Sequence, residues 1–221
     1  MTLDRRALLS ASLALPFASA AAEAGWTRPA GLTPDASIAL WPEEHIRPPA
    51  GLVEAVVQRS DDPNASDRML EKITRPRLDI FRPEKPNGAA VILAPGGGYR
   101  YVVVDKEGYE LARWLRARGV TVYVLFYRLP GDGWSNGSDV PLADAQRAVR
   151  LVRSRAKRDG IDPARVAFGG FSAGGQVATS LLTRFDAQVY DPVDAADAQP
   201  ARPDALAPIY PVVSMGPAIA H

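Results

Sequence analysis

The chain has 221 residues, with 26 lysines and arginines against 25 aspartates and glutamates, no cysteine and two histidines. One domain is expected at this length, and the near balance of charge disfavours a nucleic-acid surface that neutralises phosphates. The absence of cysteine excludes disulfides, thiolate zinc sites and a catalytic thiol. A mechanism that needs histidine therefore has only His45 and His221 to use.

The first 24 residues predict a bacterial export signal. Arg5 and Arg6 form a positively charged n-region, residues 7–22 form an apolar h-region, and residues 18–24 offer small-x-small cleavage sites. The arginine pair resembles a twin-arginine signal. Pro16 interrupts the run, which is shorter than the ~20 residues that span a membrane. We expect residues 1–24 to be removed and residues 25–221 to form one exported domain, periplasmic or secreted, with no membrane attachment after cleavage.

The rest of the chain predicts alternating strands and helices after an irregular N-terminal segment, residues 26–75, that has at most edge strands. Apolar runs and strand-forming residues predict strands over residues 77–82, 89–94, 120–127, 165–169 and 206–213. Helical spacing predicts helices over residues 107–118, 141–159 and 173–183, with Trp114 in the core. Residues 130–140 and 186–203 are expected to be loops. This order predicts an α/β fold with a mostly parallel sheet and helices on both faces.

A Gly-x-Ser-x-Gly motif at residues 170–174 follows a predicted strand and precedes a predicted helix. A serine nucleophile needs a strained turn there, so Gly170 and Gly174 are the residues that let strand and helix pass closely. The same pattern occurs at residues 133–137, but no strand precedes it and it lies in a loop. Context therefore selects Ser172 over Ser135.

A glycine-rich loop, residues 95–99, follows the buried strand 89–94. Its main chain is suited to donate N–H groups to an oxyanion, and the N-terminus of the helix after Ser172 points further N–H groups there. A phosphate cradle is the alternative, but the P-loop ending Gly-Lys-Ser/Thr is absent. No helix start follows Pro95, which also disfavours dinucleotide binding. This pair of loops favours acyl transfer.

Several separated motifs together resemble the bacterial α/β-hydrolase esterases related to acetyl-xylan and feruloyl esterases. The motifs are Pro95-Gly-Gly-Gly-Tyr-Arg-Tyr, Lys106-Glu-Gly-Tyr, Ala112-Arg-Trp-Leu, Tyr127-Arg-Leu-Pro, Pro141-Leu-Ala-Asp-Ala-Gln-Arg-Ala and Gly170-Phe-Ser-Ala-Gly-Gly. The resemblance implies an α/β-hydrolase fold with Ser172 as nucleophile. It also implies that the oxyanion donors are the N–H of Ala173 and that of Gly97 or Gly98. Pro95 departs from the wider fold, where many members carry histidine, but the glycines supply the donors.

Other residues near these motifs have weaker interpretations. Tyr99 and Arg100 are candidates for a sugar- or aryl-binding cleft, although exposed loop aromatics are common. Asp144 is expected to interact with a helix N-terminus rather than to serve as the triad acid. Asp79 has no catalytic argument.

The general base is the missing part of the predicted site. In this fold the triad order is serine, acid, histidine, and after Ser172 only His221 follows, at the last position. The acids that follow are Asp186, Asp191, Asp194, Asp197 and Asp204. His45 lies in a polar segment and is expected to be solvated. Similar enzymes continue into two further strands bearing the acid and the histidine, so we expect a C-terminally truncated chain with missing last strands and weak or no activity of its own.

The leading hypothesis is a serine carboxylesterase acting on small acyl esters, such as acetyl groups on plant polysaccharide. A serine peptidase of the prolyl-oligopeptidase type is an alternative, although residues 26–75 leave no room for its propeller. A non-catalytic carbohydrate-binding module of the same fold is another. No metal site and no cofactor is expected. The expected partner is a small-molecule or polysaccharide ester, not nucleic acid, and the oligomeric state stays open.

Overall fold

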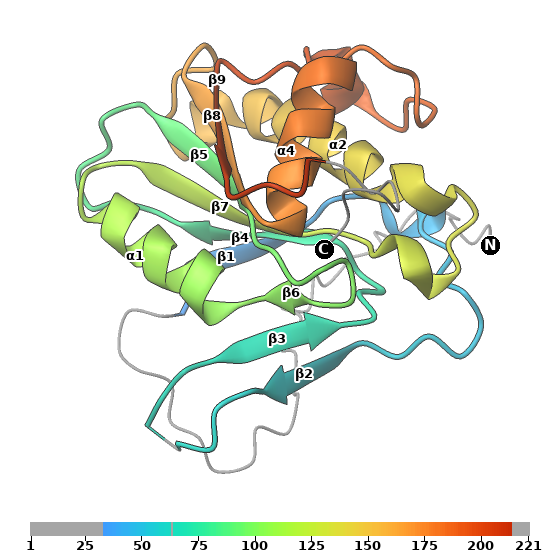
Figure 1. Cartoon of the computed structure of the whole chain (residues 1–221). Coiled ribbons are helices and arrows are strands. Elements are labelled where there is room, and N and C mark those ends of the chain that lie inside the picture. Colours follow the sequence, from blue (N-terminus) through green and yellow to red (C-terminus); the bar gives the residue numbers. More distant parts are fainter. Residues whose placement is uncertain (1–32, 63, 214–221) are drawn as a thin grey trace, which may run out of the picture.

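The computed structural model describes residues 33–62 and 64–213 (Figure 1). The predicted export signal and His221 lie outside these residues. The main sheet contains β1 (Ala36–Ala39), β4 (Arg77–Phe81), β5 (Ala90–Ala94), β7 (Thr121–Phe126), β8 (Val166–Phe171) and β9 (Ala205–Ile209). Its strand order is β1-β4-β7-β5-β8-β9.

The sheet is parallel where the predicted crossover helices connect its strands. β5 pairs in parallel with β7 and with β8, and β8 pairs in parallel with β9. β1 and β4 complete the other side in antiparallel pairs. No helix lies between β4 and β5 in the chain, so the connection lacks the crossover that would make the two strands run in the same direction. The mostly parallel sheet is confirmed. The last predicted strand is shorter than expected, because β9 ends at Ile209 and Tyr210 takes a positive φ of 35°.

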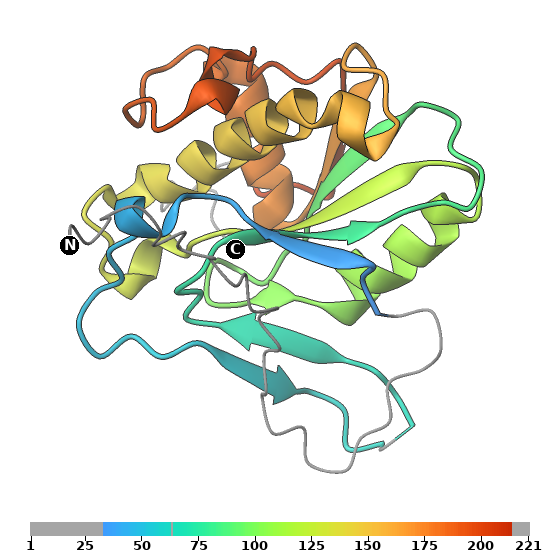
Figure 2. The same cartoon turned by 180° about the vertical axis from the view of Figure 1, so that it is seen from behind.

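Helices cover both faces of this sheet, as predicted (Figures 1 and 2). The helix α1 (Glu110–Arg116) packs on one face, while α2 (Val140–Ser154) and α4 (Ala173–Arg184) pack on the other. The predicted helix over residues 141–159 is divided, since α2 ends at Ser154 and α3 (Ala156–Asp159) follows. The predicted loop over residues 130–140 contains two 3₁₀ turns, η3 (Pro130–Asp132) and η4 (Gly137–Asp139). Another short turn, η5 (Ala195–Ala198), lies in the loop over residues 186–203.

The predicted core position of Trp114 is wrong. Its side chain is 52% exposed, and the Arg118 guanidinium lies 3.6 Å from the ring centroid. Ala112 is the buried residue of α1. Successive helical residues are ~100° apart, so Trp114 projects from the side of the helix opposite Ala112.

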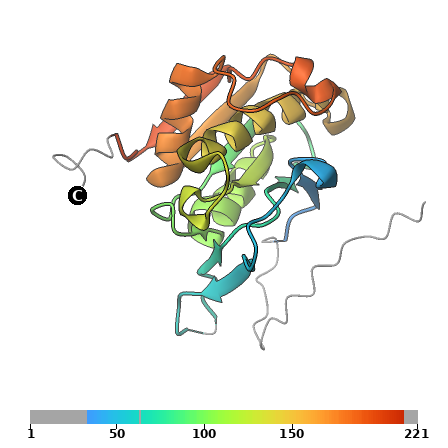
Figure 3. The same cartoon turned by 90° about the vertical axis from the view of Figure 1, so that its right-hand side faces the viewer.

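A second, antiparallel sheet comes mostly from the N-terminal segment. It contains β2 (Ala55–Gln58), β3 (Arg68–Glu71) and β6 (Val102–Val103), in that order, and η1 (Glu43–His45) precedes it in the chain. It lies on the side of the molecule away from α2 and α4 (Figure 3). A π-helical turn, η2 (Asp105–Tyr109), connects β6 to α1, so the predicted helix over residues 107–118 begins in this turn. Fully buried Asp105 fixes the turn through a two-pronged pair with Arg68.

Candidate active site

Ser172 lies on a sharp turn between β8 and α4, as the motif predicts. β8 extends to Phe171 and α4 begins at Ala173, so the serine alone forms the turn. Its backbone has φ 49° and ψ −114°, a strained conformation that costs about 1–3 kcal/mol for a residue other than glycine. The Ser172 N–H donates to Ile209 O at 3.0 Å, and its carbonyl accepts from Gln176 N–H and Val212 N–H at 3.0 and 3.2 Å. The last residue of β9 and the segment just after it therefore hold the serine turn in place through backbone hydrogen bonds.

Both motif glycines are required by close backbone contacts. A Cβ at Gly170 would lie 2.0 Å from Gly174 O, and a Cβ at Gly174 would lie 2.0 Å from Ala94 O. Both distances are far below van der Waals contact. The start of α4 is thus packed directly against the ends of β5 and β8, which is the close passage that the sequence motif predicts.

The glycine loop after β5 lies against the serine. A Cβ at Gly96 would be 3.0 Å from Ser172 Cβ. Gly97 has φ 144°, and a Cβ there would lie 2.0 Å from Tyr101 O. Gly98 follows with φ 61°. These positive φ values turn the loop back on itself, and Val103 N–H closes it by donating to Gly96 O at 2.9 Å.

Some backbone N–H groups of this region have no acceptor among the described residues. Within residues 33–62 and 64–213, no acceptor hydrogen-bonds to the N–H of Gly97, Gly98 or Ala173. Ala173 is the first residue of α4, where the helix dipole adds positive potential. Free N–H groups beside a serine are the donors that an oxyanion requires.

A pocket of about 340 Å³ lies between the glycine loop, η4 and α4, and Ser172 is not among its lining residues. It is lined by Tyr99, Pro130, Ser138, Asp139, Pro141, Leu142, Gln176, Val177, Ser180 and Arg184. An ion pair between Arg184 and Asp139, 2.9 Å long, joins α4 to η4 at its edge. Its volume lies in the range of small-molecule sites, ~300–1,000 Å³.

The two residues predicted for a substrate cleft differ in position. Tyr99 lines the pocket in a left-handed conformation, φ 58°, and its ring meets that of Tyr127 edge-on. Burial raises the pKa of Tyr99 well above its usual value, so the phenol stays protonated. Arg100 is exposed and does not line this pocket. Of the two, Tyr99 alone lines this pocket, and the substrate cleft itself stays a prediction.

The second Gly-x-Ser-x-Gly copy lies in a loop, as predicted. Residues 133–137 lie between the turns η3 and η4, and Ser135 is exposed. Trp134 is the buried residue of the copy, with the Arg128 guanidinium 5.1 Å from its ring centroid. The loop lacks the strand that would hold a nucleophile.

Among the described residues, none supplies a general base to Ser172. His45 is exposed, as expected, and no hydrogen bond joins it to the serine. The hydrogen bond from Arg147 is the main cause that lowers the pKa of Asp194, and His45 adds a smaller electrostatic contribution. His45 therefore lies with a different group of residues.

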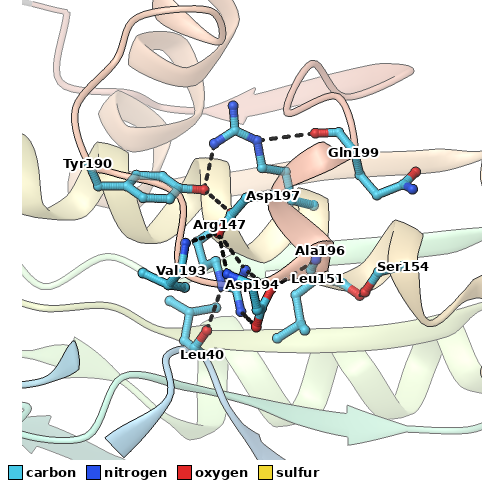
Figure 4. A network of polar contacts seen from close by, with 11 residues as sticks. Leu40, Arg147, Leu151, Ser154, Tyr190, Val193, Asp194, Ala196, Asp197 and Gln199 are labelled. Carbon is cyan, nitrogen blue, oxygen red and sulfur yellow. Dashed lines mark hydrogen bonds and ion pairs between the residues drawn. The ribbon is translucent and has the colours of Figure 1, made fainter. Parts of the chain in front are cut away.

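That group is a buried ionic network around Arg147 of α2 (Figure 4). Arg147 pairs with Asp194 at 2.5 Å and with Asp197 at 3.0 Å, and donates to Leu40 O at 2.9 Å. The hydrogen bond from Arg147 lowers the pKa of Asp194. Burial alone would raise the pKa of Asp197, but hydrogen bonds and the Arg147 charge lower it. These carboxylates clamp the loop over residues 186–203 to α2.

The remaining acids that follow Ser172 and have a described contact also point elsewhere. Asp204 pairs with Arg153 at 2.8 Å and accepts from Val166 N–H at 2.9 Å. Asp191 accepts a hydrogen bond from Gln188 at 3.3 Å. No contact of these acids with Ser172 occurs within the described part of the chain.

Asp144 is a structural anchor, and its predicted interaction with a helix N-terminus is wrong. It is fully buried and pairs with the Arg128 guanidinium at 2.7 Å. Its oxygens also accept from Arg128 N–H at 2.8 Å and from Trp41 Nε1–H at 2.7 Å. The partner is a buried arginine because an isolated carboxylate in the core would be too costly. Asp79 accepts a hydrogen bond from the Tyr109 hydroxyl.

Glu107 is a residue of the site to which the sequence patterns assign no role. Its carboxylate accepts from Gly96 N–H at 2.6 Å and from the Tyr210 hydroxyl at 2.8 Å, which places it beside the glycine loop. Its position inside the Lys106-Glu-Gly-Tyr motif was the available signal.

No group of three potential metal ligands occurs among the described residues. Within the same residues, no helix has the length and apolar character needed to cross a membrane.

A family model described as the alpha/beta hydrolase fold matches residues 92–219, more than half of the chain. The chain belongs to the α/β-hydrolase family. The crystal structure of an acetyl ester-xyloside bifunctional hydrolase from Caldicellulosiruptor lactoaceticus is also similar, with 31% identity and a TM-score of 0.57. That likeness covers 83% of this chain and 60% of the other. The fold predicted from the sequence is confirmed.

Two curated relatives are similar to part of this α/β-hydrolase chain. An acetylxylan esterase of Xylanibacter ruminicola is 35% identical over 146 residues, which are 66% of this chain and 27% of the relative. An endo-1,4-beta-xylanase B of Butyrivibrio fibrisolvens is 34% identical over 126 residues, 57% of this chain and 20% of the relative. The chain thus spans less than a third of these relatives, and the resemblance to xylan-related esterases is confirmed.

Proposed function

We propose that this α/β-hydrolase is a serine carboxylesterase that hydrolyses small acyl esters. The observation that carries the proposal is Ser172 on its strained turn, beside a glycine loop in which the N–H groups of Gly97 and Gly98 have no acceptor among the described residues. An esterase needs a nucleophile that is exposed above the end of the sheet, and hydrogen-bond donors placed where the oxyanion forms. Gly96 of the glycine loop lies close to Ser172, and Gly174 of α4 packs against the end of β5, so the serine and the glycine loop lie close together.

In the proposed reaction, the Ser172 hydroxyl oxygen attacks the ester carbonyl while a base takes its proton. The negative charge on the carbonyl oxygen is held by the N–H of Ala173 and that of Gly97 or Gly98. The intermediate collapses to an acyl-serine, and the proton passes to the departing alcohol. Water then releases the acid by the reverse sequence of bond changes. The proposal assigns the base to a histidine outside the described residues.

Without that histidine, the site is expected to hydrolyse esters weakly or not at all. A site with oxyanion donors and no base keeps only part of the rate enhancement, about 10³–10⁴ over water in a well-studied serine hydrolase.

The proposed substrate is an acetyl ester on a plant polysaccharide such as xylan. Support comes from the names of the relatives, an acetylxylan esterase and an acetyl ester-xyloside hydrolase. Such polymers lie outside the cell, which agrees with the export signal proposed for residues 1–24.

The test uses protein expressed from the complete open reading frame. A fluorophosphonate probe should label Ser172, as located by peptide mapping, and the protein should release acetate from acetylated xylan. Ser172→Ala should abolish labelling and acetate release, while the matched control Ser135→Ala should leave both unchanged. Labelling at Ser135, or full activity of Ser172→Ala, would contradict the proposal.

Export is tested separately. Expression in a bacterium should give periplasmic or secreted material whose N-terminus lies near residues 19–25. Replacing Arg5 and Arg6 by lysine should retain the protein in the cytoplasm if the twin-arginine route is used.

A further inference from the structure

Glu107 joins the glycine loop to the segment after β9. One oxygen, Oε2, accepts from Gly96 N–H at 2.6 Å, and the other, Oε1, accepts from the Tyr210 hydroxyl at 2.8 Å. The short distance to Gly96 is typical of a charge-assisted hydrogen bond, which is about twice as strong as a neutral one. Each of the two carboxylate oxygens of Glu107 therefore accepts one hydrogen bond.

The carboxylate also lies close to the candidate nucleophile. The point where a Gly96 Cβ would stand is 3.0 Å from Glu107 Oε2 and 3.0 Å from Ser172 Cβ, so both side chains lie on the same side of Gly96. Tyr210 extends the link, because it lies between Ile209 and Val212, which hydrogen-bond to the Ser172 backbone. One carboxylate thus connects the loop that carries the free N–H groups to the chain that holds the serine.

The turn that carries Glu107 is itself rigid. It is the π-helical turn η2, a rare conformation that is frequent at functional sites. Asp105, two residues before Glu107, pairs with Arg68 in the core. Tyr109, two residues after it, donates to Asp79. Buried contacts on both sides therefore fix the position of the glutamate.

A loop of consecutive glycines needs such a contact. Glycine loses more conformational freedom on folding than any other residue, and Gly96, Gly97 and Gly98 follow one another here. The N–H groups of Gly97 and Gly98 have no partner of their own among the described residues. Their direction thus depends on how the two ends of the loop are held.

We propose that Glu107 is a positioning residue for the oxyanion donors: its hydrogen bonds to Gly96 and Tyr210 set the direction of the Gly97 and Gly98 N–H groups relative to Ser172. This inference rests on the proposed esterase function. Glu107 is not assigned as the general base, because its oxygens accept from Gly96 N–H and the Tyr210 hydroxyl and no hydrogen bond joins them to the Ser172 hydroxyl among the described residues.

The first test is kinetic and uses protein from the complete open reading frame with p-nitrophenyl acetate. Glu107→Ala should lower kcat about 100-fold, the usual effect of misplacing a reacting group by ~1 Å, with KM changed less than about 3-fold. Glu107→Gln keeps an oxygen for Gly96 N–H and should recover kcat to within about 10-fold of wild type. The control Glu110→Ala changes an exposed glutamate at the start of α1 and should behave as wild type.

The second test does not depend on catalysis. The amides of Arg100, Tyr101 and Val103 donate to the carbonyls of Gly96 and Gly97, so hydrogen exchange there reports the order of the loop. Glu107→Ala should speed their exchange about 10-fold and leave α4 unchanged, and Glu107→Gln should give a smaller increase. Glu107→Gln and Tyr210→Phe also serve as milder variants should Glu107→Ala fail to fold.

The outcomes separate the two proposals. Unchanged exchange in Glu107→Ala, or faster exchange with kcat within 2-fold of wild type, would overturn the role of Glu107. An equal loss of kcat in Glu107→Gln and Glu107→Ala would also overturn it. A wild-type protein that hydrolyses no ester would refute the esterase proposal. The hydrogen-exchange measurement would still decide whether Glu107 orders the glycine loop.

Discussion

Gly174 offers a direct test of the packing at the serine turn. A Cβ at this position would lie 2.0 Å from Ala94 O and 2.7 Å from Pro95 O. Both atoms are backbone, and Ala94 ends the central strand β5, so no side-chain rotation relieves the clash. Overpacking a tight interior usually costs 1–3 kcal/mol. We expect Gly174→Ala to lower the free energy of unfolding by about 3 kcal/mol, or Tm by roughly 6–12 °C for a chain of this size.

Urea denaturation and calorimetry measure this loss, and the second motif copy supplies a matched control. Gly137 occupies the equivalent position there, with φ 52° and no heavy atom within 4 Å of the point where a Cβ would stand. Gly137→Ala should cost only the left-handed backbone penalty, about 1–2 kcal/mol. A Gly174→Ala protein within about 1 kcal/mol of wild type, or an equal loss in both variants, would refute the packing argument.

Two further predictions concern Arg147 and Trp114. Arg147→Met leaves the buried Asp197 carboxylate without its partner and should cost about 3–5 kcal/mol in urea denaturation at pH 7. Because the folded-state pKa values of Asp194 and Asp197 lie below 3.8, the deficit should be full above about pH 4 and shrink as the pH falls through those lowered values; a deficit constant from pH 7 to pH 2 would contradict this. Trp114→Gln should change the free energy of unfolding by less than about 0.5 kcal/mol, because the ring is mostly exposed, and a loss above about 1 kcal/mol would show that the ring is packed.

The main strands and helices were predictable because their signals are local. The apolar runs that became β5 and β7 are buried throughout or nearly so, and such runs are typical of central parallel strands. The direction of β4 was not predictable, because hydrophobic periodicity says nothing about which way a strand runs. The predicted burial of Trp114 was wrong for a related reason. Helical spacing locates an apolar stripe but not which of its neighbours is buried, and in α1 the buried residue is Ala112.

The candidate site divides in the same way. Ser172, Gly170 and Gly174 were predictable because the close approach of strand and helix leaves a fixed sequence pattern. Glu107 and Asp144 were not, because their partners are distant in the chain: Glu107 reaches Tyr210, and Asp144 reaches Trp41. A single carboxylate in a sequence carries no record of which backbone N–H it will meet.

The hydrogen bonds of Ser172 also bear on the order of events during synthesis. Its N–H and its carbonyl both find partners in Ile209 and Val212, which leave the ribosome well after the serine itself. Until that segment arrives and β9 pairs with β8, the strained backbone at Ser172 lacks the bonds that hold it. The nascent chain should therefore carry an unformed turn until residues 209–212 have emerged, and the serine should acquire its final geometry as β9 docks.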